Sequence, residues 1–214
     1  MTQLTYTGGG AVRLVPDPVQ LLAAFVHTDP GAAYLDHRPI TPPNTLVPED
    51  LAVTLVVNSR ADGRPFISLM QRGSSFDLAS VPETPLADSS DQVRAAAVDR
   101  IADLASWSGF GASLATKVLH KKRPALIPIL DNQAIFGAYL NPAWPAARSL
   151  TETVKSRDRI AAALEQIRTD LVRPDNAEAW RELRDHAPRW TQIEIWDAVW
   201  WMYFREKEPV RLSR

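Results

Sequence analysis

Ser108-Gly109-Phe110-Gly111 separates two segments whose apolar residues recur at helical spacing, one ending near Trp107 and the other running from 112 to 119. Two glycines one residue apart between helices indicate a tight turn. Such a turn exposes backbone N–H groups at the positive end of the second helix, where a phosphate oxygen binds well. Glycine also lets a nucleic-acid backbone approach closely. We interpret the turn as a candidate phosphate contact, and a purely structural turn between helices is the alternative.

Capping patterns mark the starts of further helices on both sides of this turn. In each, a side chain that caps helices well is followed three residues later by glutamine or glutamate, which is typical of a helix N-terminus. The mainly α fold class is predicted from their number. They are Asp17-Pro18-Val19-Gln20, Ser89-Ser90-Asp91-Gln92, Ser149-Leu150-Thr151-Glu152, Asp175-Asn176-Ala177-Glu178 and Thr191-Gln192-Ile193-Glu194.

Two short apolar segments, 51–57 and 66–70, can be read as strand or as helix. Their β-branched residues favour strands, whereas Pro48-Glu49-Asp50 resembles the first turn of a helix. We expect buried helices, because the rest of the chain is helical. Residues 29–48 and 72–88 are rich in proline and small polar residues and are predicted to be loops.

The composition excludes several classes of protein. The 214 residues include no cysteine, so disulfides, thiolate metal sites, iron–sulfur clusters and cysteine nucleophiles are absent. The four histidines lie far apart, and no metal cage is evident in the sequence. A net charge of −1 argues against a protein that coats a polyanion. The sequence has no apolar run of membrane-spanning length and no signal peptide, so we expect a cytoplasmic monomer without a membrane or protein partner.

The segment after the turn carries the charges that suggest chemistry. Between Trp107 and Leu130 there are four basic residues and no acidic one, which favours a phosphate-binding patch; capping of a helix C-terminus is the alternative. An extended, proline-spaced segment then leads to Asp131 at the start of another expected helix. Asp131 is a candidate catalytic carboxylate, and a plain helix N-cap is the alternative. The four basic residues are Lys117, Lys121, Lys122 and Arg123.

This pattern resembles the helix-hairpin-helix DNA glycosylase superfamily. Gly109-Phe110-Gly111 matches the hairpin, Ala115 the small residue on the second helix, and Asp131 the aspartate. Asp131 follows Gly111 by 20 residues, the interval usual in the family. The segment from Ala115 to Pro128 looks still more like an actinobacterial family of unknown function that is related to this superfamily. The resemblance covers about a fifth of the chain.

The resemblance implies a helix-hairpin-helix glycosylase-like architecture and a function. The chain would be a single compact unit, with one helical lobe formed by 1–88 and the C-terminal helices and another by 89–148. It would be a DNA N-glycosylase in which Asp131 stabilises the oxocarbenium-like transition state and activates water. Ser113 stands where bifunctional members carry a lysine nucleophile, so the enzyme would be monofunctional and free of metal and cofactor. The DNA contacts implied are Gly109, Phe110, Gly111, Ser113, Lys117, Lys121 and Lys122.

Aromatic residues are the candidates for a pocket that holds a base flipped out of DNA. Trp196, Trp200 and Trp201 lie on the amphipathic segment after Thr191 and are expected in the core. The excised base, and the choice between DNA repair and attack on foreign DNA, stay open. So does the alternative of a non-catalytic DNA-binding protein in which Asp131 only caps a helix. The pocket candidates are Trp107, Trp144, Tyr34 and Phe76.

Overall fold

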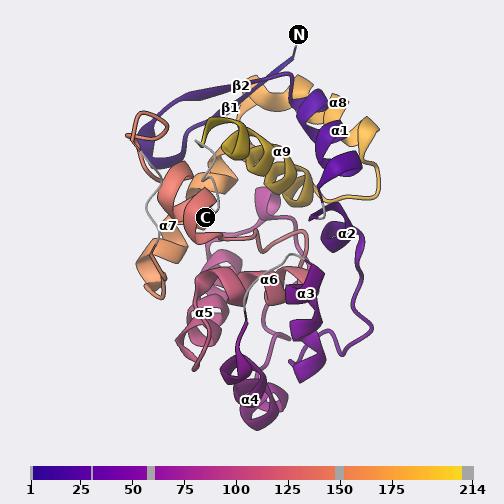
Figure 1. Ribbon diagram of the computed structural model, residues 1–214, viewed down its shortest axis with the longest axis vertical. Coiled ribbons are helices and arrows are strands. Elements are labelled where there is room, and N and C mark those ends of the chain that lie inside the picture. The colour runs from indigo at the N-terminus through magenta and orange to yellow at the C-terminus, as the bar shows by residue number, and fades with distance from the viewer. Residues whose placement is uncertain (1, 30, 57–60, 148–151, 209–214) are drawn as a thin grey trace, which may run out of the picture.

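The computed structural model describes residues 2–29, 31–56, 61–147 and 152–208, and this part of the chain is mainly helical (Figure 1). The prediction of a mainly α fold is confirmed. Within these residues, no helix is long and apolar enough to cross a bilayer. The helices are α1 (Pro18–Thr28), α2 (Gly31–Asp36), α3 (Val53–Val56), α4 (Gly63–Arg72), α5 (Asp91–Ser106), α6 (Ala112–Lys122), a π-helix (Asn132–Tyr139), α7 (Arg157–Leu171), α8 (Ala177–His186) and α9 (Gln192–Lys207).

An antiparallel hairpin of β1 (Gln3–Tyr6) and β2 (Arg13–Pro16) was not predicted. Its turn contains Gly9 and Gly10, both with positive φ, a conformation that glycine adopts at low cost. Tyr6 at the end of β1 is fully buried, and its ring packs edge-on against Trp196 and Trp200 of α9. The hairpin thus covers one side of the aromatic core at the upper end of the molecule (Figure 1).

The capping patterns located most helix starts, but not always for the expected reason. Ser90 caps α5 by accepting a hydrogen bond from the Val93 N–H, and Thr191 and Glu194 form the expected capping box of α9. α8 begins at Ala177 as expected, yet the Asn176 side chain bonds to Thr5 of β1 instead of capping. Asp17 makes no side-chain cap bond at α1. The pattern at 149–152 lies mostly outside the described residues, and α7 begins later, at Arg157.

The two ambiguous apolar segments are helical, as predicted, in the described residues. Residues 53–56 form α3, and 66–70 lie within α4; residue 57 lies outside the described residues. The prediction that both helices are buried is wrong, because Leu55 of α3 is largely exposed and α4 exposes Phe66, Ile67 and Met70. The expected loop at 29–48 also contains the short helix α2.

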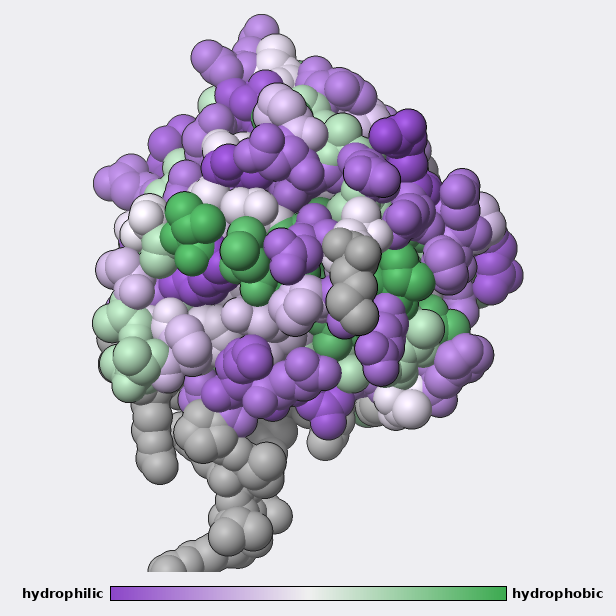
Figure 2. All heavy atoms as spheres, turned by 90° about the horizontal axis from the view of Figure 1, so that it is seen from above, coloured by the Kyte–Doolittle hydropathy of each residue, from purple (hydrophilic) through white to green (hydrophobic). Residues whose placement is uncertain are grey.

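One continuous core joins the two ends of the molecule. Trp196 and Trp200 are fully buried, as predicted, whereas Trp201 is only partly buried. Figure 1 places α3 and α4 at the same end as α5 and α6. The division into two lobes at residue 88 stays a prediction. On the face seen from above, hydrophobic residues form small separate groups among hydrophilic ones (Figure 2).

Candidate active-site cavity

The predicted turn between α5 and α6 is present and is packed against α4. Gly109 has a φ of +82°, which favours glycine. A Cβ atom at Gly109 would lie only 2.4 Å from Cδ of Pro65. The Ser68 hydroxyl donates to the Ser108 carbonyl at 3.0 Å. The α4 helix therefore occupies the space that this glycine opens.

Gly111 and the start of α6 are covered by another segment of the chain. A Cβ atom at Gly111 would lie 2.7 Å from Cγ2 of Thr153. The Ala112 N–H donates to the Val154 carbonyl at 2.8 Å, and Phe110 is buried. Ser113 stays partly exposed on α6. The prediction that Gly111 opens the helix start to a phosphate is wrong, because residues 153 and 154 take that place.

The basic residues at the C-terminus of α6 are buried, so the prediction of a surface patch at Lys121 and Lys122 is wrong. The Lys122 ammonium lies 2.8 Å from the Asp50 carboxylate and donates to Thr41 Oγ1 at 2.7 Å. The neighbouring Arg123 guanidinium donates to backbone carbonyls of the loop that precedes α5 and of the segment before α3. These cations hold loops onto the end of α6.

Asp131 has the position expected of it, at the start of the π-helix. Its Oδ1 atom accepts hydrogen bonds from the N–H groups of Gln133 at 2.8 Å and Ala134 at 3.0 Å. Asp131 is thus an N-cap, and the cap fixes the orientation of the carboxylate. Its Oδ2 atom lies 3.8 Å from the Lys117 ammonium, and about a quarter of the side chain is exposed.

Asp131 and Lys117 line a cavity of about 400 Å³. Five elements form its walls: α1, α2, α6, the π-helix and α9. A cavity of this size with apolar walls and a few polar groups is typical of a small-molecule site. Lys117 thus lies at the cavity wall with little of its side chain exposed, and its contact with DNA stays a prediction. The aromatic residues that line the cavity are Phe25, Tyr34, Trp200 and Trp201.

Two further carboxyl groups line this cavity, in different environments. Asp29 is paired with Arg205 and also accepts hydrogen bonds from the indole of Trp201 at 3.2 Å and the Gly31 N–H at 2.7 Å. The Oδ2 atom of Asp197 accepts a hydrogen bond from the Ile129 N–H at 3.1 Å. Burial raises the pKa of Asp197 well above its ordinary value. The cavity thus contains two acidic groups that each lie beside a basic one, and a third acidic group, Asp197, in which burial favours the protonated form.

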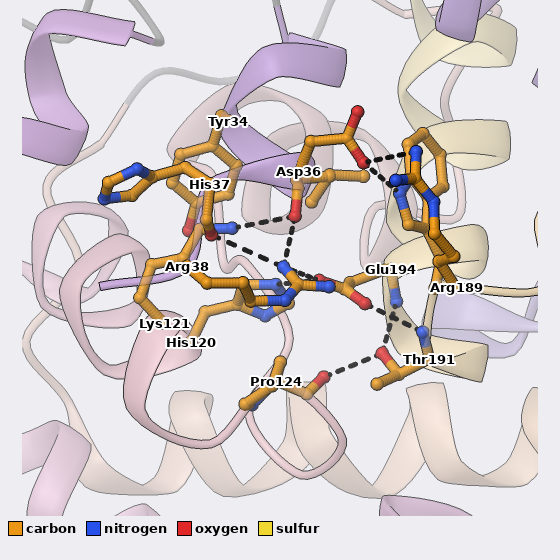
Figure 3. Close-up of polar contacts among 12 residues, drawn as sticks. Tyr34, Asp36, His37, Arg38, His120, Lys121, Pro124, Arg189, Thr191 and Glu194 are labelled. Atoms are coloured by element: carbon orange, nitrogen blue, oxygen red, sulfur yellow. Dashed lines mark hydrogen bonds and ion pairs between the residues drawn. The ribbon is translucent and has the colours of Figure 1, made fainter. Parts of the chain in front are cut away.

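A buried polar network behind Tyr34 holds this wall of the cavity (Figure 3). The Tyr34 hydroxyl donates to the Lys117 carbonyl at 2.8 Å, and the Lys121 ammonium lies 3.9 Å from the centre of the Tyr34 ring. Glu194 of α9 pairs with Arg38 at 3.0 Å. Burial lowers the pKa of Lys121 to about 8 and that of His120 to about 3. The network joins α2, α6 and α9 around the tyrosine.

Comparison with known proteins gives a family. The model of a family of unknown function, DUF6308, matches residues 20–204. The chain belongs to DUF6308. No curated protein and no solved structure matches it. The matched region contains every residue that lines the cavity except Arg205.

Of the four predicted pocket residues in this DUF6308 chain, only Tyr34 lines the cavity. Phe76 and Trp107 pack edge-on against each other, with ring centres 5.6 Å apart, beside the turn. Trp144 lies in the core, where its indole donates to Glu208 at 2.8 Å. Within the described residues, no group of three or more side chains could hold a metal ion.

Sequence reasoning missed most of the cavity. One signal was present, because Asp197 is an acidic residue in the middle of the apolar helix that contains Trp196 and Trp200. A charge in such a position indicates either a buried partner or a site. The signal of Asp29 is weaker, since it lies in a segment predicted to be a loop. The missed lining residues that carry polar groups are Asp29, Asp197, Trp201 and Arg205.

Proposed function

We propose that this chain is a monofunctional DNA N-glycosylase that hydrolyses the bond between a damaged or modified base and deoxyribose. The observation that carries the proposal is the position of Asp131, a carboxylate oriented by two backbone N–H groups at the wall of an aromatic cavity. The order of elements around it, α5, a glycine turn, α6, an extended segment and a capped helix, supports a helix-hairpin-helix glycosylase-like architecture.

The chemistry needs a carboxylate beside the sugar. Breaking the N-glycosidic bond develops positive charge on the sugar ring, and a fixed negative group stabilises that charge without having to reorganise. The Oδ1 atom of Asp131 is used by the cap, so Oδ2 is the atom that faces the anomeric carbon or orients the attacking water. The flipped base then stacks against Tyr34 and Trp201 in the cavity.

Contact with DNA has to come from residues that remain exposed beside the turn. Ser108 and Arg64 are exposed there, and Phe66 and Ile67 of α4 are apolar and half exposed. Apolar side chains of this kind can fill the gap that a flipped nucleotide leaves in the duplex. This assignment moves the DNA contact from the end of α6, where the lysines are buried, to α4.

The second candidate function is a non-catalytic DNA-binding protein in which Asp131 only caps a helix. The two cap bonds of Asp131 favour it. However, a cap accounts for Oδ1 alone and gives no role to Lys117 or to the cavity. Burial of Lys121 and Lys122 also weakens a function that depends on gripping phosphates alone.

The replacement Asp131→Asn separates the two candidates, because asparagine caps helices as well as aspartate does and removes only the charge. We expect excision to fall by about 10²–10³-fold or more, with DNA affinity unchanged or higher. The assay incubates the protein with duplexes that contain assorted modified bases and scores abasic sites. Asp158→Asn is the matched control, because Asp158 is exposed in the first turn of α7, outside the cavity and away from α4. Full turnover by Asp131→Asn on any confirmed substrate refutes the catalytic role.

A further inference from the structure

Asp197 lines the cavity, and in the described part of the chain only one of its two carboxyl oxygens accepts a hydrogen bond. It projects from α9, which is held against the π-helix by a hydrogen bond from the Trp200 indole to the Ala134 carbonyl at 2.8 Å. Its Oδ2 atom accepts the Ile129 N–H, and among the described residues its carboxyl group has no other hydrogen-bond partner. The Oδ1 atom is therefore available to a ligand.

The groups around Asp197 determine its protonation. Glu194 on the same helix raises the pKa of Asp197, in addition to burial, whereas Lys121 on α6 and the Ile129 N–H lower it. The hydroxyl groups of Tyr6 on β1 and Tyr34 on α2 also lie near enough to interact with its charge. Because Oδ2 accepts a backbone N–H, the proton of the neutral acid lies on Oδ1. The carboxyl group then presents an O–H donor.

The remaining charges of the cavity cancel. Asp131 lies beside Lys117, and Asp29 is paired with Arg205. With Asp197 neutral, the lining has no net charge. A planar ligand would then meet aromatic walls and one hydrogen-bond donor, the O–H group of Asp197. An ionised Asp197 would instead leave a net negative cavity, which suits a positively charged ring held by aromatic faces.

We propose that Asp197 donates a hydrogen bond from Oδ1 to an acceptor atom of an uncharged base, so that the cavity takes neutral bases and not positively charged alkylated ones. This inference rests on the proposed function for its substrate, a base in DNA. It assigns Asp197 the role of choosing the base and Asp131 the role of cleaving its bond.

The test measures binding of free nucleosides by quenching of tryptophan fluorescence, because Trp200 and Trp201 line the cavity. The probes are two matched pairs: deoxyadenosine with its 1-methyl derivative, and deoxycytidine with its 3-methyl derivative. Each methylated nucleoside is positively charged at neutral pH. We expect at least one neutral nucleoside to bind, and to bind more tightly than its charged partner.

Two replacements of Asp197 distinguish the neutral from the ionised carboxyl group. Asp197→Asn keeps an acceptor for the Ile129 N–H and an N–H donor in place of the O–H, so binding is expected to stay within about threefold. Asp197→Leu removes both, and loss of one hydrogen bond is expected to weaken binding about tenfold. Asp62→Asn is the control outside the cavity, and circular dichroism confirms that each variant is folded.

Three results overturn the inference: binding of no nucleoside, tighter binding of the charged partners with loss in Asp197→Asn, or unchanged binding in folded Asp197→Leu. Failure of the proposed function is distinguishable from these. If binding depends on Asp197 but no base is excised from DNA, the proposed glycosylase function is refuted and the role of Asp197 in binding is not. If excision depends on Asp131 but not on Asp197, only the role proposed for Asp197 is refuted.

Discussion

Replacing Lys122 by alanine is expected to lower the free energy of unfolding by about 3–5 kcal/mol, the usual cost of removing one partner of a buried ion pair. All three donors of the Lys122 ammonium are used, on the Asp50 carboxylate at 2.8 Å, Thr41 Oγ1 at 2.7 Å and the Pro42 carbonyl at 2.8 Å. Both charged side chains are almost fully buried. Alanine would leave the buried Asp50 carboxylate without its cationic partner, with only the Thr41 hydroxyl and the Val47 N–H still donating to it.

The assay is urea unfolding at pH 7 in low and high salt, followed by circular dichroism. For a chain of this size, the loss corresponds to a fall in melting temperature of roughly 10 °C. Lys155→Ala is the matched control, since Lys155 is exposed, and it should change stability by no more than about 0.5 kcal/mol. Replacing Lys122 and Asp50 together by methionine and leucine should recover much of the loss. A loss below about 1 kcal/mol in Lys122→Ala would show that this lysine behaves as a surface residue.

Three further predictions concern the turn, the network and the chemistry. Gly109→Ala should destabilise the fold by more than about 2 kcal/mol in urea unfolding, because positive φ and Pro65 both oppose a Cβ atom. Gly10→Ala is the control, because Gly10 also has positive φ but open space around it. Equal losses of stability in the two variants would contradict the packing argument. Because the pKa of Lys121 falls to about 8, the folded state loses this proton before the unfolded state, so stability should rise from about pH 8 toward pH 9.5. Lys121→Met should abolish that rise in unfolding curves measured across this range, and a rise that persists in the variant would refute the assignment. Borohydride should trap no adduct with DNA and EDTA should leave excision intact, since Ser113 stands at the lysine position; a trapped adduct would point to Lys117 as a nucleophile.

Local chemistry made part of this fold predictable. Ser90 and Thr191 mark the starts of α5 and α9, because the side chain of a capping residue accepts a hydrogen bond from a backbone N–H only two or three residues away. The turn at Gly109 and the arrival of Asp131 at a helix start depend on equally short stretches. Each of these features is decided by neighbours in the sequence, and a pattern read along the chain can find them.

The errors come from contacts between distant segments. The basic run at Lys121 reads as a surface patch because its partners are absent from the neighbouring sequence: the Asp50 carboxylate lies about 70 residues earlier. The cavity has the same origin, since Tyr34, Asp131 and Asp197 come from three separate parts of the chain. Burial of a charge is a property of tertiary packing, and composition and spacing carry little information about it.

Helix α9 affects how the cavity forms during synthesis. The Trp200 indole binds the Ala134 carbonyl, and the Ala134 N–H binds Asp131, so one residue of the π-helix links α9 to the carboxylate. α9 also supplies Asp197 and Trp201 to the cavity. A nascent chain that has released α6 and the π-helix from the ribosome still lacks this wall. The cavity is therefore complete only when residues up to Arg205 of α9 have been made, well after Asp131 and the π-helix.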